Sequence, residues 1–161
     1  MKIDLNKVLS SEVIKVFEDG GFNIEATQIY PDSILTSGPI YFLVYSSELP
    51  YIKEDYYGIL SKEDNIIPYD ILKRGAVNGS DDLTIEINKD NKDNNNFDGL
   101  IVPKFIKCIE NLNISRITND FTGAYGCGLY GLPDDMRERY NFIEGIVLKL
   151  KDIQNRLKDI M

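Results

Sequence analysis

A long helical pattern near the C-terminus constrains the fold of this chain more than any other feature. Apolar residues recur there mostly at alternating spacings of four and three positions. They are Met136, Tyr140, Ile143, Ile146, Leu150, Ile153, Leu157 and Ile160. Pro133 fits the first helical position, and Asp134 and Asp135 fit the first turn, where the helix dipole favours acids. A helix of about 28 residues spans roughly 40 Å. We expect it to pack along one face of a sheet.

The same helix offers an alternative role in self-association. Its apolar spacing is close to the heptad repeat of a coiled coil, in which one helix face is covered by a partner helix. The clean part of the repeat covers barely two heptads. A homodimer through the C-terminal helix therefore stays open as an alternative to packing within one chain.

Several shorter segments have the periodicity of β-strands. Ile40–Tyr45 is apolar on both faces, which is typical of a central strand. Leu83–Ile87 alternates at period two, which is typical of a half-buried strand. We expect Tyr57–Leu60 to pair with Ile66-Ile67. The remaining predicted strands are 22–30 and 113–118.

Two further helices complete the predicted fold. Asp4–Asp19 has apolar residues at helical spacing and ends at Gly20-Gly21, because glycine readily adopts a left-handed C-cap. Pro103 fits the first position of a helix that runs to about Asn113. Its apolar stripe consists of Val102, Phe105, Ile109 and Leu112.

These elements predict an α+β fold. We expect an antiparallel or mixed sheet with an N-terminal helix, a middle helix and a long C-terminal helix packed on it. At this length, residues 1–161 are expected to form a single domain. The polar, Asn-rich segment 89–98 predicts a flexible loop.

The absence of histidine excludes several kinds of catalytic site. Neither a Ser-His nor a Cys-His nucleophile can form, and no zinc site can use a histidine ligand. The two cysteines, Cys108 and Cys127, match no zinc pattern and suit a reducing compartment. No secretory leader and no apolar run of the roughly 18 residues that span a membrane is visible. We therefore expect a cytoplasmic protein without a membrane partner.

The formal net charge of −8 is unevenly distributed. Residues 1–100 carry 18 acidic and 9 basic side chains, a balance of −9, whereas residues 101–161 carry 8 acidic and 9 basic ones, a balance of +1. The acidic part repels nucleic acid and attracts a positively charged partner. A hydrated surface that binds nothing is the alternative, and charge alone favours it.

The segment from Glu48 to Asp70 combines acids with tyrosines. It contains six acidic residues, two lysines and four tyrosines. Tyrosine buries a large area at little entropic cost, and carboxylates around it steer a cationic partner. We predict that the partner-binding residues are Glu48, Tyr51, Glu54, Asp55, Tyr56, Tyr57, Glu63, Asp64, Tyr69 and Asp70. In the alternative interpretation these are hydrated loops whose tyrosines pack on the sheet, and Asp70 caps a short helical turn.

A glycine-rich run at 123–131 contains Gly126, Gly128 and Gly131 in the G-x-G-x-x-G spacing of dinucleotide-binding loops. That motif belongs between a first strand and a helix, with further parallel strands after it, and here only the C-terminal helix follows. A tight turn whose glycines adopt positive φ explains the run better. The alternative function is a small enzyme or ligand-binding module with a carboxylate and tyrosine pocket near this run.

A calcium site is incomplete in this sequence. Asn94, Asn96, Asp98 and Gly99 imitate part of a calcium-binding loop, but Phe105 stands where a bidentate glutamate belongs. The segment before this run is predicted to be a strand, whereas such a loop lies between two helices. We therefore predict no calcium site here.

Two other chemical sites are weighed and not favoured. Asp135 and Glu138 lie three residues apart on one helix face, as metal-binding carboxylates do, but no second carboxylate-bearing helix is evident. Cys108 is expected to be buried, and Cys127 to lie in the glycine-rich run. Without histidine, neither thiol is expected to be a nucleophile. We therefore predict no catalytic residue, no metal and no cofactor.

The overall character of the chain resembles the immunity proteins of bacterial polymorphic and contact-dependent growth inhibition toxins. The chain is small, acidic and rich in Asn, Lys and Ile, and the segment GLIVPKFIKCIENLNI, Gly99–Ile114, is similar to segments of such proteins. The resemblance implies a stoichiometric inhibitor that binds a cognate toxin domain, often a basic nuclease, and covers its active site or displaces its substrate. An acidic protein that mimics nucleic acid is a further alternative.

Overall fold

The fold is α+β, as predicted, with helices packed on one side of an antiparallel sheet. The computed structural model describes residues 2–28, 38–48, 51–53, 66–68, 70–72, 83–87, 96–122 and 135–161. The strands are β1 (Lys2–Ile3), β2 (Phe22–Gln28), β3 (Gly38–Ser46), β4 (Tyr51–Lys53), β5 (Ile66–Pro68) and β6 (Thr84–Ile87). The helices are η1 (Leu5–Lys7), α1 (Ser11–Asp19), α3 (Asp98–Glu110), α4 (Ile114–Thr122) and α5 (Met136–Ile160).

The main sheet has the order β1-β2-β3-β6, and each neighbouring pair is antiparallel. β3 lies between β2 and β6, which confirms its prediction as a central strand. Ile40, Phe42 and Val44 are fully buried, whereas the alternate residues of β3 are half-buried. In β6, Ile85 is buried and Glu86 is exposed, which confirms the half-buried alternation.

The N-terminal segment forms two short helices where one was predicted. Asp4 accepts a hydrogen bond from Asn6 N and caps the 3₁₀ turn η1. Ser10 then adopts an extended conformation, and its hydroxyl accepts from Val13 N at 3.3 Å as the N-cap of α1. Each polar residue starts its own helix, so the continuous helix predicted from Asp4 is wrong. The predicted stop is confirmed, because Gly21 has φ +86°.

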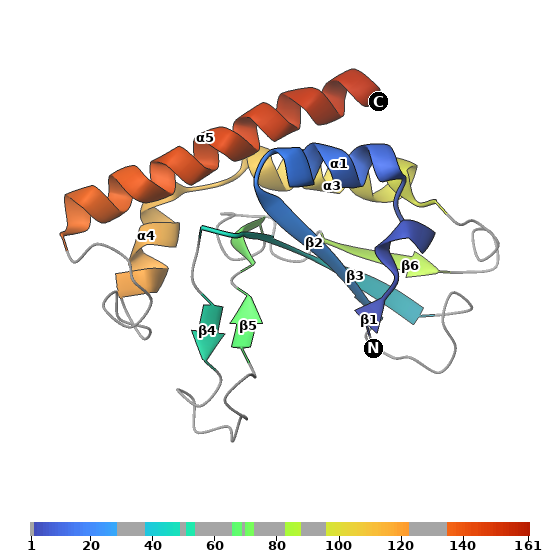
Figure 1. Ribbon diagram of the computed structural model, residues 1–161, viewed down its shortest axis with the longest axis horizontal. Coiled ribbons are helices and arrows are strands. Elements are labelled where there is room, and N and C mark those ends of the chain that lie inside the picture. Colours follow the sequence, from blue (N-terminus) through green and yellow to red (C-terminus); the bar gives the residue numbers. More distant parts are fainter. Residues whose placement is uncertain are drawn as a thin grey trace.

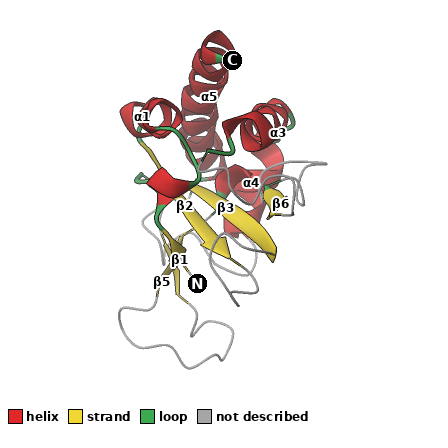
Figure 2. Ribbon diagram, turned by 90° about the vertical axis from the view of Figure 1, so that its right-hand side faces the viewer, coloured by secondary structure: helices red, strands yellow, loops and turns green. Residues whose placement is uncertain are grey.

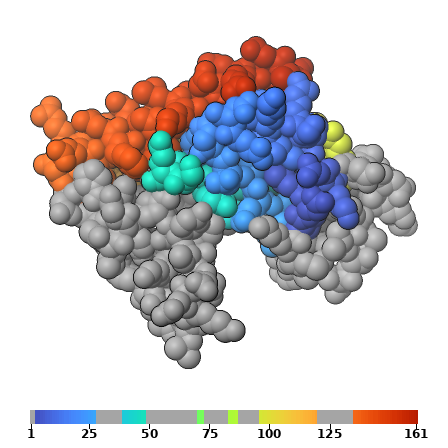
Figure 3. All heavy atoms as spheres, viewed as in Figure 1, coloured from blue at the N-terminus to red at the C-terminus, as the bar shows by residue number. Residues whose placement is uncertain are grey.

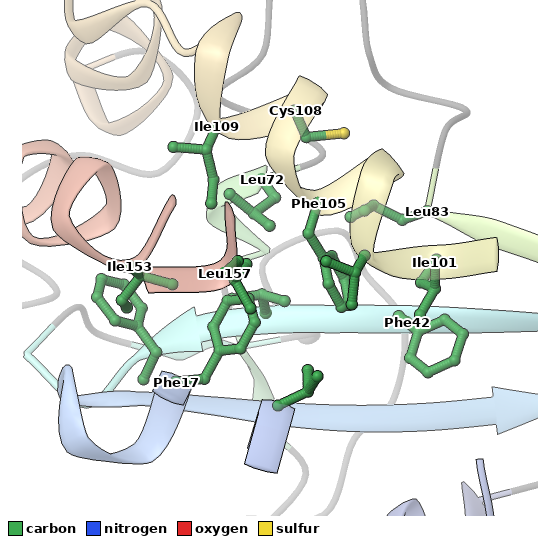
Figure 4. Packing of buried hydrophobic residues seen from close by; sticks show 14 of the residues in the cluster. Phe17, Phe42, Leu72, Leu83, Ile101, Phe105, Cys108, Ile109, Ile153 and Leu157 are labelled. Carbon is green, nitrogen blue, oxygen red and sulfur yellow. The ribbon is translucent and has the colours of Figure 1, made fainter. Parts of the chain in front are cut away.

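The centre of the core joins three elements through their phenylalanines. Phe105 of α3 packs edge-on against Phe17 of α1 at 5.2 Å between ring centroids and against Phe42 of β3 at 5.9 Å. Figure 4 shows Ile153 and Leu157 of α5 closing the same cluster. Apolar burial of this kind is the main stabilising term of a fold this size.

α3 begins earlier than predicted, at Asp98, and Pro103 lies inside it. The proline ring removes the hydrogen bond that Gly99 O would accept within the helix. Pro103 and Gly99 are both exposed, so water can bond to that carbonyl and the helix continues. The predicted stripe is confirmed in the burial of Val102, Phe105 and Ile109, and Cys108 is buried as expected.

The segment predicted as a strand at 113–118 is helical, as part of α4. Asn113 accepts a hydrogen bond from Arg116 N at 2.8 Å through its side chain and one from Ile117 N through its carbonyl oxygen. These bonds start a helix, and the buried Ile117 and Thr118 lie on one face of it. A short run rich in β-branched residues is compatible with either a strand or a helix. Here the Asn113 cap and the helical spacing of the buried residues favour the helix.

α5 confirms the predicted long helix, although it begins at Met136 with Asp135 as its N-cap. Pro133 and Asp134 lie outside the described residues. Of the predicted stripe, the buried residues are Ile143, Ile146, Leu150, Ile153 and Leu157. Met136, Tyr140 and Ile160 are exposed, and Arg139 is buried near the start of the helix instead. Figure 2 shows α5 between α1 and α3, on the side of the sheet that the helices cover, and α5 contacts both helices.

Candidate interaction surface

β4 and β5 form a two-stranded hairpin separate from the main sheet. They pair antiparallel, with Tyr51 opposite Pro68 and Lys53 opposite Ile66. The predicted partner of Ile66-Ile67 was 57–60, a segment outside the described residues, whereas the observed partner is β4. Three-residue strands carry too little periodic signal for their register to be predicted from sequence.

The hairpin places both ends of the connection 54–65 at one point of the molecule, and this connection holds four of the six acids and two of the four tyrosines of the acidic, tyrosine-bearing segment. β4 runs away from α5 and β5 returns toward it, so the connection 54–65 begins and ends on the side of the molecule remote from α5 (Figure 1). This connection contains Glu54, Asp55, Tyr56, Tyr57, Glu63 and Asp64. These residues and Tyr69 lie outside the described residues, and Tyr51 is described through its backbone.

Glu48 lies at the other end of the predicted surface and is tied to α5. Its carboxylate is 2.7 Å from Lys149 Nζ, and both side chains are about half exposed, at 47% and 49%. An exposed pair of this kind is worth roughly 0 to 1 kcal/mol. The contact offsets the charge of Glu48 and joins the chain just after β3 to α5.

Asp70 is buried, with 3% of its surface exposed, so its carboxylate does not add to an acidic surface. It accepts a hydrogen bond from the hydroxyl of Tyr41 in β3. The next residues, Ile71 and Leu72, are helical and buried in the core. Asp70 therefore links this turn to the sheet. The signal for this role in the sequence is the apolar pair Ile71-Leu72 that follows Asp70 directly.

Three basic side chains of α5 contact neighbouring elements, an arrangement that a count of charges along the sequence does not show. Lys149 bonds to Glu48, and Arg156 Nη2 lies 3.7 Å from Asp19 Oδ2 of α1. Lys151 Nζ donates to Ile109 O at 2.8 Å and lies 3.4 Å from Glu110 O, at the C-terminal end of α3. A cation there complements the helix dipole. These bases are engaged with neighbouring elements, and the acids of the helix remain at its surface.

Two hollows lie between α1 and α5. One, of about 570 Å³, is lined by Asp19, Gly20, Gly21, Leu148, Lys149 and Asp152. The other, of about 410 Å³, is lined by Glu12, Lys15, Val16, Asp19, Arg156, Asp159 and Ile160. Since both include Asp19, the hollows adjoin, and we call them together the α1–α5 furrow. Figure 3 shows α1 and α5 meeting along this face of the molecule.

The other candidate sites weighed from the sequence have structural roles or lie outside the described residues. Asp98 accepts a hydrogen bond from Ser10 N at 3.0 Å, and it begins α3 where a calcium loop would continue. Asp135 turns its carboxylate to the backbone of Arg137 and Glu138. The run 123–131, with Cys127, lies outside the described residues.

Within the part of the chain that the structure describes, no three or more Cys, Asp or Glu side chains gather closely enough to hold a metal ion. A membrane-crossing helix, one both long and apolar enough, is also not found among the described residues. Comparison of the chain with protein-family models, with curated proteins and with solved structures finds no match.

Proposed function

We propose that this chain is an immunity protein, which binds a basic toxin domain stoichiometrically and neutralises it through the connection 54–65. The observation that carries the proposal is the β4–β5 pairing, which brings the start and the end of an acidic, tyrosine-bearing segment together on one side of the molecule. A segment anchored at both ends loses less entropy on binding than a free tail of the same composition.

The composition of the connection suits capture of a cationic surface. Its carboxylates raise the rate of encounter with a basic protein, and its tyrosines provide contact area once the two meet. The role is stoichiometric rather than catalytic, so it requires neither a cofactor nor a general base. The predicted partners do not include nucleic acid or a membrane.

The first test is capture followed by inhibition. The purified chain is used to retrieve proteins from its native host, and each retrieved protein is assayed for toxicity or nuclease activity with increasing amounts of the chain. We expect full inhibition at one chain per toxin domain. Retrieval without inhibition, or inhibition that needs catalytic turnover of a substrate by the chain, contradicts the proposal.

The second test locates the surface by charge reversal. Changing Glu54, Asp55 and Asp64 together to Lys should slow toxin association by about tenfold or more at low salt, because steering depends on these charges. Reversing Glu18, Glu110 and Glu144, three exposed acids elsewhere, changes the net charge equally. If both triple variants slow association to the same extent, the connection is not the interface.

A further inference from the structure

The outer face of α5 carries an acidic stripe in a helix that is basic overall. Residues spaced three and four apart along this face are all exposed, and none of them is basic. They are Glu138, Asn141, Gly145, Leu148, Asp152, Asn155 and Asp159. Figure 2 shows this helix on the side of the described residues farthest from the sheet. The stripe therefore runs along an unpartnered face.

Four of the six basic side chains of α5 are turned toward neighbouring elements or buried, whereas Arg137 and Lys158 are exposed beside the stripe. Lys149 and Arg156 make ion pairs with Glu48 and Asp19, Lys151 binds the end of α3, and Arg139 is buried. The acids of the stripe make no ion pair within the part of α5 and its surroundings that the structure describes. Their charge is thus available to a partner.

Leu148 stands in the middle of the stripe with 62% of its surface exposed, more than any other large apolar residue described. It also lines the furrow together with Gly20 and Gly21. An apolar side chain next to a hollow and flanked by acids fits a partner that has an apolar residue between cations.

We propose that the α1–α5 furrow and the outer face of α5 bind a cationic amphipathic helix of another protein, with an apolar side chain of that helix covering Leu148. Four acids line the furrow, Glu12, Asp19, Asp152 and Asp159, against three bases, Lys15, Lys149 and Arg156. Lys149 and Arg156 are already ion-paired, and Asp152 and Asp159 also belong to the stripe, so the remaining charge favours a cationic occupant. This surface lies on the opposite side from the β4–β5 hairpin, so the inference does not depend on the proposed function.

A second copy of the chain fits this face less well. Two stripes laid against each other would bring Glu138, Asp152 and Asp159 of one copy near the same acids of the other, and like charges on facing helices are destabilising. The exposed leucine alone would have to offset that repulsion. A homodimer through the outer face of α5 is therefore an outcome that would contradict the inference.

The probe for this surface is a helix-forming peptide of about 20 residues, long enough to cover roughly 30 Å of α5. It carries Lys and Arg on one face around a central Leu, and a scrambled peptide of the same composition serves as its control. Binding of each labelled peptide to the full chain is measured by fluorescence anisotropy at several salt concentrations. We expect one amphipathic peptide per chain, bound more weakly as salt rises.

Three variants locate the binding. Leu148→Glu should weaken the amphipathic peptide by about tenfold or more, because it removes the apolar contact at the centre. Asp152→Lys should weaken it severalfold, whereas Glu110→Lys, the same charge change on an exposed position of α3, should weaken it by less than about twofold. Circular dichroism checks that each variant keeps the fold.

Three further outcomes of these measurements decide whether the inference holds. Equal binding of both peptides, or equal effects of Asp152→Lys and Glu110→Lys, shows attraction by net charge alone and overturns the inference. A dimer in sedimentation equilibrium that Leu148→Glu dissociates assigns the face to a second copy. Retained peptide affinity in the Glu54, Asp55 and Asp64 triple reversal, expected within about twofold, separates this surface from the hairpin.

Discussion

Leu148 and Leu150 lie two residues apart on α5 and have opposite environments. Leu150 is fully buried, whereas Leu148 is 62% exposed on the outer face beside the α1–α5 furrow. The inner face is apolar apart from Arg139 and Gln154, and the outer face is mostly polar around one leucine. The two faces therefore have different physical tasks. The inner face holds the helix to the fold, and the outer face contributes little to stability and is free to serve recognition.

The largest expected effect tests this contrast directly. Leu150→Asp should lower the free energy of unfolding by about 4 kcal/mol or more, because it places an unpaired charge in the core. Leu148→Asp should change it by no more than about 0.5 kcal/mol. Urea denaturation of both variants measures the difference. Similar losses in the two proteins would show that the outer face is also buried in solution.

The second prediction compares two carboxylates at opposite ends of α5. Asp135 accepts hydrogen bonds from the backbone N–H groups of Arg137 and Glu138, at 2.9 and 3.0 Å. Asp135→Ala should cost about 1 kcal/mol, the usual value of an N-cap. Asp159→Ala removes an exposed acid of the outer face and should cost close to nothing. Thermal denaturation followed by circular dichroism measures both, and an equal shift in the two variants would contradict the assigned roles.

The smallest expected effect concerns the basic residues. Lys149 pairs with Glu48, whereas Lys158 is exposed near the end of α5. Lys149→Gln should cost about 0.5 kcal/mol at low salt and less at high salt, because the pair is exposed and screened. Lys158→Gln should not show that salt dependence. A loss for Lys149→Gln that persists in concentrated salt would mean that packing, not charge, holds this contact.

Most of the helical core could be predicted because apolar residues at helical spacing report one buried face. Four residues follow that spacing and are buried where α5 contacts α1 and α3: Ile146, Leu150, Ile153 and Leu157. The pattern fails in the first turns of α5, where Met136 and Tyr140 are exposed and Arg139 is buried. There α5 also contacts α4, which had been predicted as a strand, so the covered side of the helix could not be inferred.

The candidate surfaces could be predicted only in part. The sequence shows that acids and tyrosines gather between residues 48 and 70, but not that Asp70 is buried beneath Tyr41 or that Lys149 neutralises Glu48. Both partners are far away along the chain. The acidic stripe was missed for the same reason, since residues 101–161 have a balance of +1 and only the fold shows where the bases are engaged.

Phe17 packs in one core with Phe105, Ile153 and Leu157, which are synthesised much later. This order matters for folding during translation. A ribosome adds residues from the N-terminus, at roughly 5–20 per second. The aromatic ring of α1 is therefore synthesised several seconds before the residues that cover it. During that interval α1 lacks the α5 residues that cover its apolar face in the folded chain. Stable tertiary structure must wait until residue 157 has been translated, so chaperone protection during synthesis matters more here than for a fold built from local contacts.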